Sequence, residues 1–252
     1  MARNFLIRGM ICGIAAGLIV FLYARLFGEP SVAGAIGFEE QLAHLAGEAH
    51  EHGEEIVSRD VQSGWGLFVG VMVFGTAIGG LFSLLYAYAW GRVGKLGARA
   101  TAALLAGASF VSVYLVPFLK YPANPPSIGN PDTIGTRTGL YFGMVVISVI
   151  AMVASLNLGR SLVKRLGVWN AAIAGGAIYL LLVIIVGALM PVINEVPDAF
   201  PATLLWSFRT SALAMQLILW AGIGLLFGEL TQRSLAASPA SGSRVMAASA
   251  RR

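Results

Sequence analysis

The sequence contains very little charge and almost no cysteine. Of its 252 residues only 12% are charged, whereas 57% are hydrophobic. An ordinary soluble domain has about a quarter charged residues, so this chain has too few charges to cover a globular surface. The single cysteine, Cys12, excludes a disulfide framework, a cysteine-based zinc site and an iron–sulfur cluster. The composition therefore predicts an integral membrane protein.

Charged residues and histidine are also missing from the middle of every long apolar run. Their absence argues against a proton relay or a carboxylate ion site at membrane depth. The segment 91–96 (GRVGKL) lacks the spacing and the Ser or Thr of a phosphate-binding loop, so the chain is not expected to couple to ATP itself. No nucleophile and base are paired at that depth, which argues against an enzyme.

Six apolar runs can each cross a hydrocarbon core of roughly 30 Å as a helix. They are residues 5–27, 64–91, 100–119, 138–159, 168–190 and 210–228. The sequence therefore predicts an all-α polytopic bundle, with one membrane domain over residues 1–231 and a disordered cytoplasmic tail over 232–252. Glycines spaced four residues apart, among them Gly9, Gly13, Gly75 and Gly79, predict closely packed helices.

Lysine and arginine are distributed unevenly between the connecting segments. The N-terminus, the segments after the second and fourth runs and the tail hold 12 of the 17 basic residues. The positive-inside rule therefore predicts that both termini are cytoplasmic. Eleven of the 12 acids lie in the other segments, where they would concentrate cations outside the membrane. Because topology and contact with membrane lipid explain the net charge of +5, no nucleic-acid partner is expected.

The polar segment 28–63 contains all three histidines and eight of the 12 acids. Its part from 38 to 57 is predicted to be helical, so that residues four apart share one stripe. Imidazole and carboxylate ligands suit divalent transition metals, although a solvated acidic helix with no ligand would have the same pattern. The candidate metal ligands are Glu39, Glu40, His44, Glu48, His50 and His52.

Two further segments on the same predicted side are stiffened by proline, which fixes the backbone φ angle. They span residues 120–137 and 191–209. Their oxygen-bearing side chains could take an ion from the flexible segment, or could only shape turns at the membrane surface. The candidates in this predicted outer vestibule are Asn124, Asn130, Asp132, Asn194 and Glu195.

Several sequence blocks, in order, resemble one family. They are RGMICGIAAG (8–17), LFGEP (26–30), FEE (38–40), VPFLKYPANPP (116–126), GNPDTIG (129–135), NEVP (194–197) and FPATLLW (200–206). Over about residues 3–230 the chain resembles the bacterial CbtA family of cobalt transporter subunits. This resemblance implies cobalt uptake for cobalamin synthesis and a small single-span partner subunit that carries histidines.

The family is often described with five spans, against the six counted above. One alternative would remove the first run: Ala33-Gly34-Ala35 follows a basic start and an apolar run, as at a signal-peptide cleavage site. That run is long for a signal peptide, and Pro30 precedes the cleavage point. We therefore retain six spans as the prediction.

The sequence thus predicts a multi-pass subunit that takes up Co²⁺ across the bacterial inner membrane. Co²⁺ is the expected transported ion, and no permanently bound cofactor is expected. The expected partners are membrane lipid, a divalent metal cation and the small histidine-bearing subunit. The alternative is a non-transporting scaffold or metal-sensing subunit, which needs no conducting path.

Overall fold

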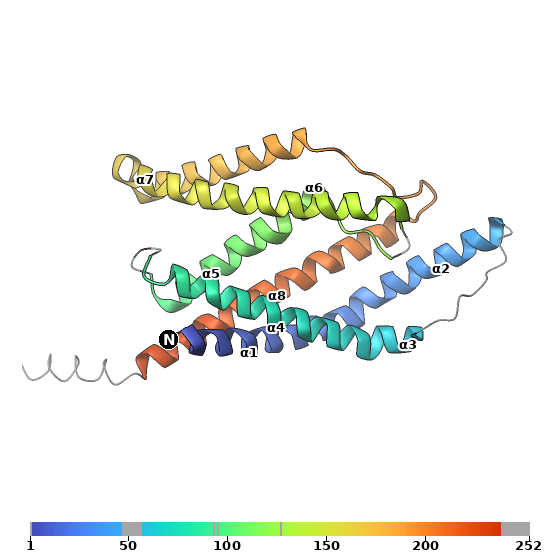
Figure 1. Cartoon of the computed structure of the whole chain (residues 1–252), viewed down its shortest axis with the longest axis horizontal. Coiled ribbons are helices and arrows are strands. Elements are labelled where there is room, and N and C mark those ends of the chain that lie inside the picture. Colours follow the sequence, from blue (N-terminus) through green and yellow to red (C-terminus); the bar gives the residue numbers. More distant parts are fainter. Residues whose placement is uncertain (1, 47–56, 93, 95, 127, 238–252) are drawn as a thin grey trace, which may run out of the picture. The chain divides into compact units, whose positions relative to one another are not determined.

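The computed structural model describes residues 2–46, 57–92, 94, 96–126 and 128–237, and within these ranges all regular structure is helical. The elements are α1 (Ala2–Tyr23), η1 (Ala24–Gly28), α2 (Glu29–Ala46), α3 (Arg59–Val61), η2 (Gln62–Gly66), α4 (Leu67–Ala89), α5 (Ala98–Ser109), η3 (Phe110–Leu115), α6 (Val116–Lys120), η4 (Pro131–Thr133), α7 (Ile134–Leu189) and α8 (Ala202–Ala236) (Figure 1). The predicted all-α class is therefore confirmed for the described residues.

Five helical stretches in the described residues are long and apolar enough to cross a membrane. They are Arg3–Leu45, Arg59–Ala89, Ala98–Lys120, Pro131–Leu189 and Ala202–Ala236. The difference from the predicted six arises in α7, which contains both the fourth and the fifth predicted runs.

The helix α7 turns back on itself at Gly167 (Figure 1). The backbone there has φ 75° and ψ 167°, a conformation that essentially only glycine adopts. On either side of this turn, the hydroxyl groups of Ser148 and Tyr179 lie 2.8 Å apart, and both side chains are buried. Met144 and Val183 are buried in the same core. The segments 134–166 and 168–189 are therefore two arms that pack against each other, the N-terminal and C-terminal arms of α7.

The first helix continues where the sequence predicts a loop from residue 28. Pro30 has no N–H to donate, and its ring would clash with the carbonyl four residues earlier in a regular α-helix. The wider turn of the π-helical η1 ends two residues before Pro30 and gives the ring room. The π-helical η3 ends two residues before Pro117 in the same way. The prediction of a loop is therefore wrong from Gly28 to Gly37, whereas the helix predicted from residue 38 is confirmed as far as Ala46, where the described residues of this segment end.

Contacts divide the chain into two compact units. Unit 1 contains Met1–Arg25, Val57–Gly107 and Met215–Arg252, and unit 2 contains Leu26–Ile56 and Ala108–Ala214. The prediction of one bundle over residues 1–231 stays a prediction. Within unit 1, α8 remains helical to Ala236, and residues 238–252 of the predicted tail lie outside the described residues.

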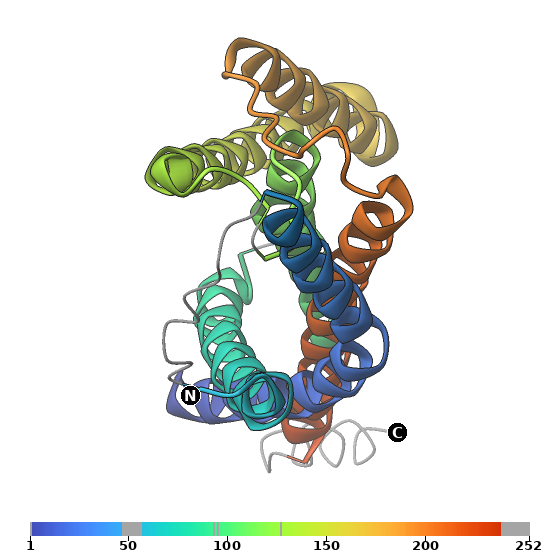
Figure 2. The same ribbon diagram turned by 90° about the vertical axis from the view of Figure 1, so that its right-hand side faces the viewer.

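The core of unit 1 depends on a close approach of α1 and α4, which lie side by side (Figure 2). A methyl group added to Gly13 would overlap the carbonyl oxygen of Gly75, and one added to Gly79 would overlap the carbonyl oxygen of Gly9. The predicted role of these four glycines in helix packing is confirmed. A ring cluster closes the same core, where Phe227 of α8 meets Tyr86 at 4.8 Å and Phe82 at 5.5 Å between ring centroids.

Candidate functional site

The predicted metal ligands of the first polar segment are only partly within the described residues. Glu39, Glu40 and His44 lie on α2 with exposed side chains. Glu40 and His44 are one helical turn apart, as the predicted stripe requires. Glu48, His50 and His52 lie outside the described residues. Within the described ranges, no three His, Cys, Asp or Glu side chains are grouped so that they could hold a metal ion.

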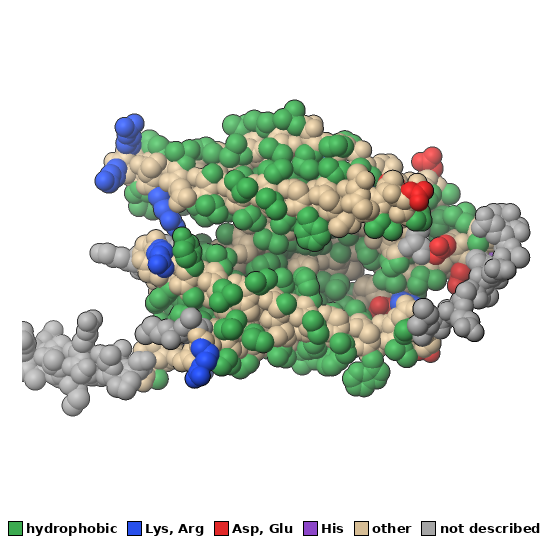
Figure 3. Space-filling model, in the orientation of Figure 1, with side chains coloured by type: hydrophobic (Ala, Val, Ile, Leu, Met, Phe, Trp, Pro, Cys, Tyr) green, Lys and Arg blue, Asp and Glu red, His purple; other side chains and the backbone are tan. Residues whose placement is uncertain are grey.

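The other five predicted residues all lie in two loops of unit 2, before α7 and between α7 and α8. They are Asn124, Asn130, Asp132, Asn194 and Glu195. In the α7 part of Figure 3, Lys and Arg side chains gather at the end where the helix turns back, and Asp and Glu gather at the opposite end. The end of α7 that carries these loops is therefore the acidic end.

Glu195 connects the two loops. Its Oε1 accepts a hydrogen bond of 2.6 Å from Thr133 Oγ1, and its Oε2 accepts one of 2.9 Å from the backbone N–H of Asn130. The Nε of Arg137 lies 3.3 Å from Oε2. The hydrogen bond from Thr133, the one from Asn130 and the charge of Arg137 together lower the pKa of Glu195 below its ordinary value of 4.5. The Glu195 carboxylate is therefore ionised and internally paired.

Asn130 shapes the turn that leads into α7. Its Oδ1 accepts a hydrogen bond of 2.9 Å from the N–H of Asp132, which caps η4. Its carbonyl accepts a hydrogen bond from Arg137 Nη2 at 3.1 Å and lies 2.9 Å from Thr133 Oγ1, whose single hydrogen it shares with Glu195. The two loops also meet through Lys120, whose Nζ donates to the carbonyl of Met190 at 3.0 Å. These contacts define a loop latch, formed by Lys120, Asn130, Thr133, Arg137 and Glu195.

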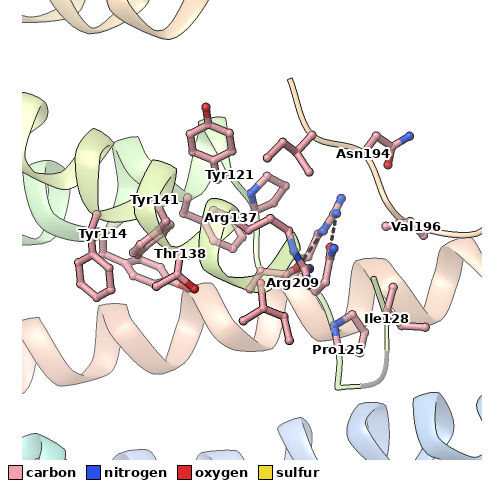
Figure 4. Close-up of a pocket in the computed structure, with 17 residues that line it drawn as sticks. Tyr114, Tyr121, Pro125, Ile128, Arg137, Thr138, Tyr141, Asn194, Val196 and Arg209 are labelled. Carbon is pink, nitrogen blue, oxygen red and sulfur yellow. Dashed lines mark hydrogen bonds between the residues drawn. The ribbon is translucent and has the colours of Figure 1, made fainter. Parts of the chain in front are cut away.

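Beside the loop latch, unit 2 contains a cavity of about 550 Å³ (Figure 4). Arg209 of α8 lines it, donating from Nε to the carbonyl of Ala123 at 3.1 Å and from Nη2 to Asn124 Oδ1 at 2.9 Å. Figure 4 shows Tyr114, Tyr141 and Thr138 on one side of the two arginines and Asn194 and Val196 on the other. The cavity therefore combines an aromatic wall with the guanidinium groups of Arg137 and Arg209.

The helix α2 is attached to the wall of this cavity. Ile128 and Val196 line the cavity and also pack in a core with Ala35 of α2 and Phe200. The rings of Phe38 and Phe200 meet edge to face, with centroids 5.0 Å apart. Because Glu39 directly follows Phe38, the exposed acids of α2 begin one residue from this core.

The most informative residues that sequence reasoning missed are Arg137 and Arg209, which it counted only as charges on one side of the membrane. Arg209 is the only charged residue between Asp198 and Glu229. A lone charge beside a long apolar run is costly unless it is paired, and that was the signal available. Nothing local in the sequence indicated that Thr133 or Arg137 would meet Glu195, which is more than 55 residues away.

Comparison with known proteins gives one match. Residues 2–232 match the family model described as probable cobalt transporter subunit (CbtA). The match includes α2, the loop latch and every residue that lines the cavity. No curated protein and no solved structure matches the chain.

Proposed function

Because the chain belongs to the family of probable cobalt transporter subunits (CbtA), we propose that it takes up Co²⁺ across the bacterial inner membrane. The membrane-spanning capacity of its helices and its family make it a multi-pass membrane protein of cobalt transport. The inner membrane, the direction of transport and the route of the ion are parts of the proposal.

The observation that carries the proposal is the position of α2. Glu39, Glu40 and His44 are exposed on it, and oxygen and imidazole ligands suit Co²⁺. We propose that these side chains, with Glu48, His50 and His52, capture the ion transiently at the outer surface. The acids at the acidic end of α7, in the loops that contain Asp132 and Glu195, would raise the local cation concentration.

We further propose six crossings, with both termini in the cytoplasm. The two arms of α7 supply the extra crossing, because Gly167 reverses the chain between them. Lys164 and Arg165 lie next to this turn, and the positive-inside rule would place them in the cytoplasm. Asp132 and Glu195, at the other ends of the two arms, would then face outward.

The membrane potential can supply the energy for such uptake. A single charge gains roughly 2.3 kcal/mol for each 100 mV, so a divalent cation gains about twice that amount on entering a negative interior. The family description calls these proteins subunits, which implies a partner component. We propose that this partner is a small single-span subunit with histidines, that Co²⁺ is cargo, and that the chain holds no resident cofactor.

One observation favours the second candidate function, a non-transporting scaffold or metal-sensing subunit. The side-chain oxygens of Asn124, Asn130 and Glu195 already accept hydrogen bonds from the chain itself. An ion that used them as ligands would first have to break the loop latch or the hydrogen bond from Arg209 to Asn124. A protein whose outer loops only dock a partner would need no such step.

The test is accumulation of radiolabelled cobalt in metal-starved bacterial cells. Cells that express this chain are compared with empty-vector cells, each with and without excess nickel and with the membrane potential collapsed. The expected result is that cells with this chain take up more cobalt than empty-vector cells, that this uptake needs the membrane potential, and that excess nickel does not abolish it. No uptake, with the chain shown to be in the membrane, both alone and beside a small histidine-bearing subunit, would leave the scaffold or sensor.

A further inference from the structure

The cavity of unit 2 has a charge opposite to the one expected for a cation route. Among the residues that the structure describes, its lining contains two arginines, Arg137 and Arg209, and no aspartate or glutamate. A divalent cation without its own anionic ligands would be repelled there, because like charges interact strongly in a partly desolvated site. We propose that this cavity binds the phosphate group of an anionic amphiphile, a phospholipid headgroup.

Arg209 supplies the uncompensated charge. Its side chain is half-buried, and its two partners, the Ala123 carbonyl and Asn124 Oδ1, are neutral oxygens. Among the residues that the structure describes, no carboxylate forms an ion pair with it. Charges removed from water are normally paired, and the planar guanidinium group matches a phosphate with two parallel hydrogen bonds. An anion is therefore the missing partner.

Arg137 adds donors without adding much net charge. Glu195 offsets its charge from 3.3 Å, and the buried Nε of Arg137 makes no hydrogen bond to the residues that the structure describes. Thr138 and Asn194 also line the cavity, and their side chains can donate to oxygen. The site therefore offers one uncompensated cation and several neutral donors to an oxyanion.

The apolar part of the lining favours an amphiphile over a free anion. Phe118 and Tyr114 belong to it, together with Ile134 and Phe142, whose side chains are 54% and 61% exposed. Exposed apolar side chains beside a guanidinium group suit a ligand with an acyl chain attached to its phosphate. The tyrosines are typical of the membrane–water interface, where headgroups lie.

The experiment uses the full chain purified in detergent, without cobalt, so that its result does not depend on transport. Native mass spectrometry measures binding of phosphatidylglycerol and, as the zwitterionic control whose choline cation offsets the charge of its phosphate, phosphatidylcholine. We expect wild type to bind phosphatidylglycerol in preference and Arg209→Gln to bind it about tenfold more weakly, as for loss of a charge-assisted hydrogen bond. Arg160→Gln on α7, whose side chain is exposed and does not line the cavity, is the matched control and should bind like wild type.

A second pair of variants leaves both arginines in place. Thr138→Glu introduces a negative charge into the cavity and should weaken phosphatidylglycerol binding, whereas Thr138→Gln should weaken it much less. Circular dichroism and size-exclusion chromatography identify any variant that does not fold. If a variant of one pair does not fold, the other pair, Arg209→Gln with its control or Thr138→Glu with Thr138→Gln, tests the proposal. Equal affinity of Arg209→Gln and wild type, or of Thr138→Glu and Thr138→Gln, would overturn the proposal.

Inorganic phosphate and glycerol 3-phosphate distinguish the two sources of the anion. A lipid site predicts that neither displaces phosphatidylglycerol at millimolar concentration. Displacement by inorganic phosphate alone would overturn the lipid assignment and leave a site for a free oxyanion. The outcome is separate from cobalt uptake, since a chain that transports no cobalt can still bind the lipid.

Discussion

The hydroxyl oxygens of Ser148 and Tyr179 lie 2.8 Å apart inside unit 2, although 31 positions separate the two residues in the chain. In one continuous helix these residues would lie about 46 Å apart along the axis. The hydrogen bond therefore exists only because α7 reverses at Gly167. This reversal decides whether α7 crosses the membrane once or twice. Two predictions test it.

The first prediction is that Gly167→Ala destabilises the protein by about 1–3 kcal/mol, because a Cβ is strained at a φ of 75°. Gly143→Ala on the N-terminal arm is the control, since a methyl group there meets open space and alanine favours a helix. The measurement is thermal unfolding in detergent. A Gly167→Ala variant as stable as Gly143→Ala would show that the reversal does not need glycine.

The second prediction concerns the sides of the membrane. Single cysteines replacing Lys164 and Asp198 should react with an impermeant thiol reagent from opposite sides, the first from the cytoplasm and the second from outside. Cys12 is buried, so the background should remain low. Labelling of both positions from the same side would rule out two crossings by α7.

The spans themselves could be predicted because length and apolar composition are local properties of the sequence. Both runs inside α7 were visible in this way, and so were the closely spaced glycines of α1 and α4, although not which helix each would contact. The continuation of the first helix through Pro30 could not be predicted. It depends on the wider turn of η1, and the helix propensities of the residues there do not indicate a π-helical turn. The pairing of Glu195 with Thr133 was equally hidden, since it is a property of loop closure and not of either segment.

The third prediction tests the close approach of α1 and α4. Gly13→Ala should destabilise the protein by about 1–3 kcal/mol, because the new methyl group overlaps the backbone of Gly75 and one helix must move. Gly70→Ala, on the partner helix α4 but facing open space, should be neutral or slightly stabilising. Thermal unfolding of both variants in detergent provides the comparison, and equal midpoints would contradict a tight helix contact.

The fourth prediction tests ion capture by α2. The triple variant Glu39→Gln, Glu40→Gln and His44→Ala should take up less cobalt than wild type at low external cobalt and as much as wild type at high external cobalt. The reason is that capture affects the apparent affinity more than the maximal rate. Glu29→Gln, at the start of the same helix, is the matched control. If the triple variant takes up cobalt like wild type at every concentration, α2 does not capture the ion.

The fifth prediction is a pH dependence of stability from Glu195. Its hydrogen bonds from Thr133 and Asn130 and the charge of Arg137 lower its pKa below 4.5 in the folded protein. A carboxyl group with a lowered folded-state pKa stabilises the fold fully above its ordinary pKa. That contribution is lost as the pH falls from the ordinary pKa through the lowered folded value. Wild type should therefore lose thermal stability as the pH falls from the ordinary pKa of 4.5 through the lowered folded value, beyond the loss common to all variants.

Glu195→Gln isolates this contribution. Glutamine still accepts hydrogen bonds but does not titrate, so the variant should be less stable than wild type near neutral pH and approach it in acid. Asp198→Asn is the control: Asp198 is an exposed carboxylate in the same loop, without a hydrogen bond or ion pair to the described residues, and its loss should leave the slope unchanged. Parallel curves for wild type and Glu195→Gln from neutral pH to acid would mean that the loop latch is held by groups other than this carboxylate.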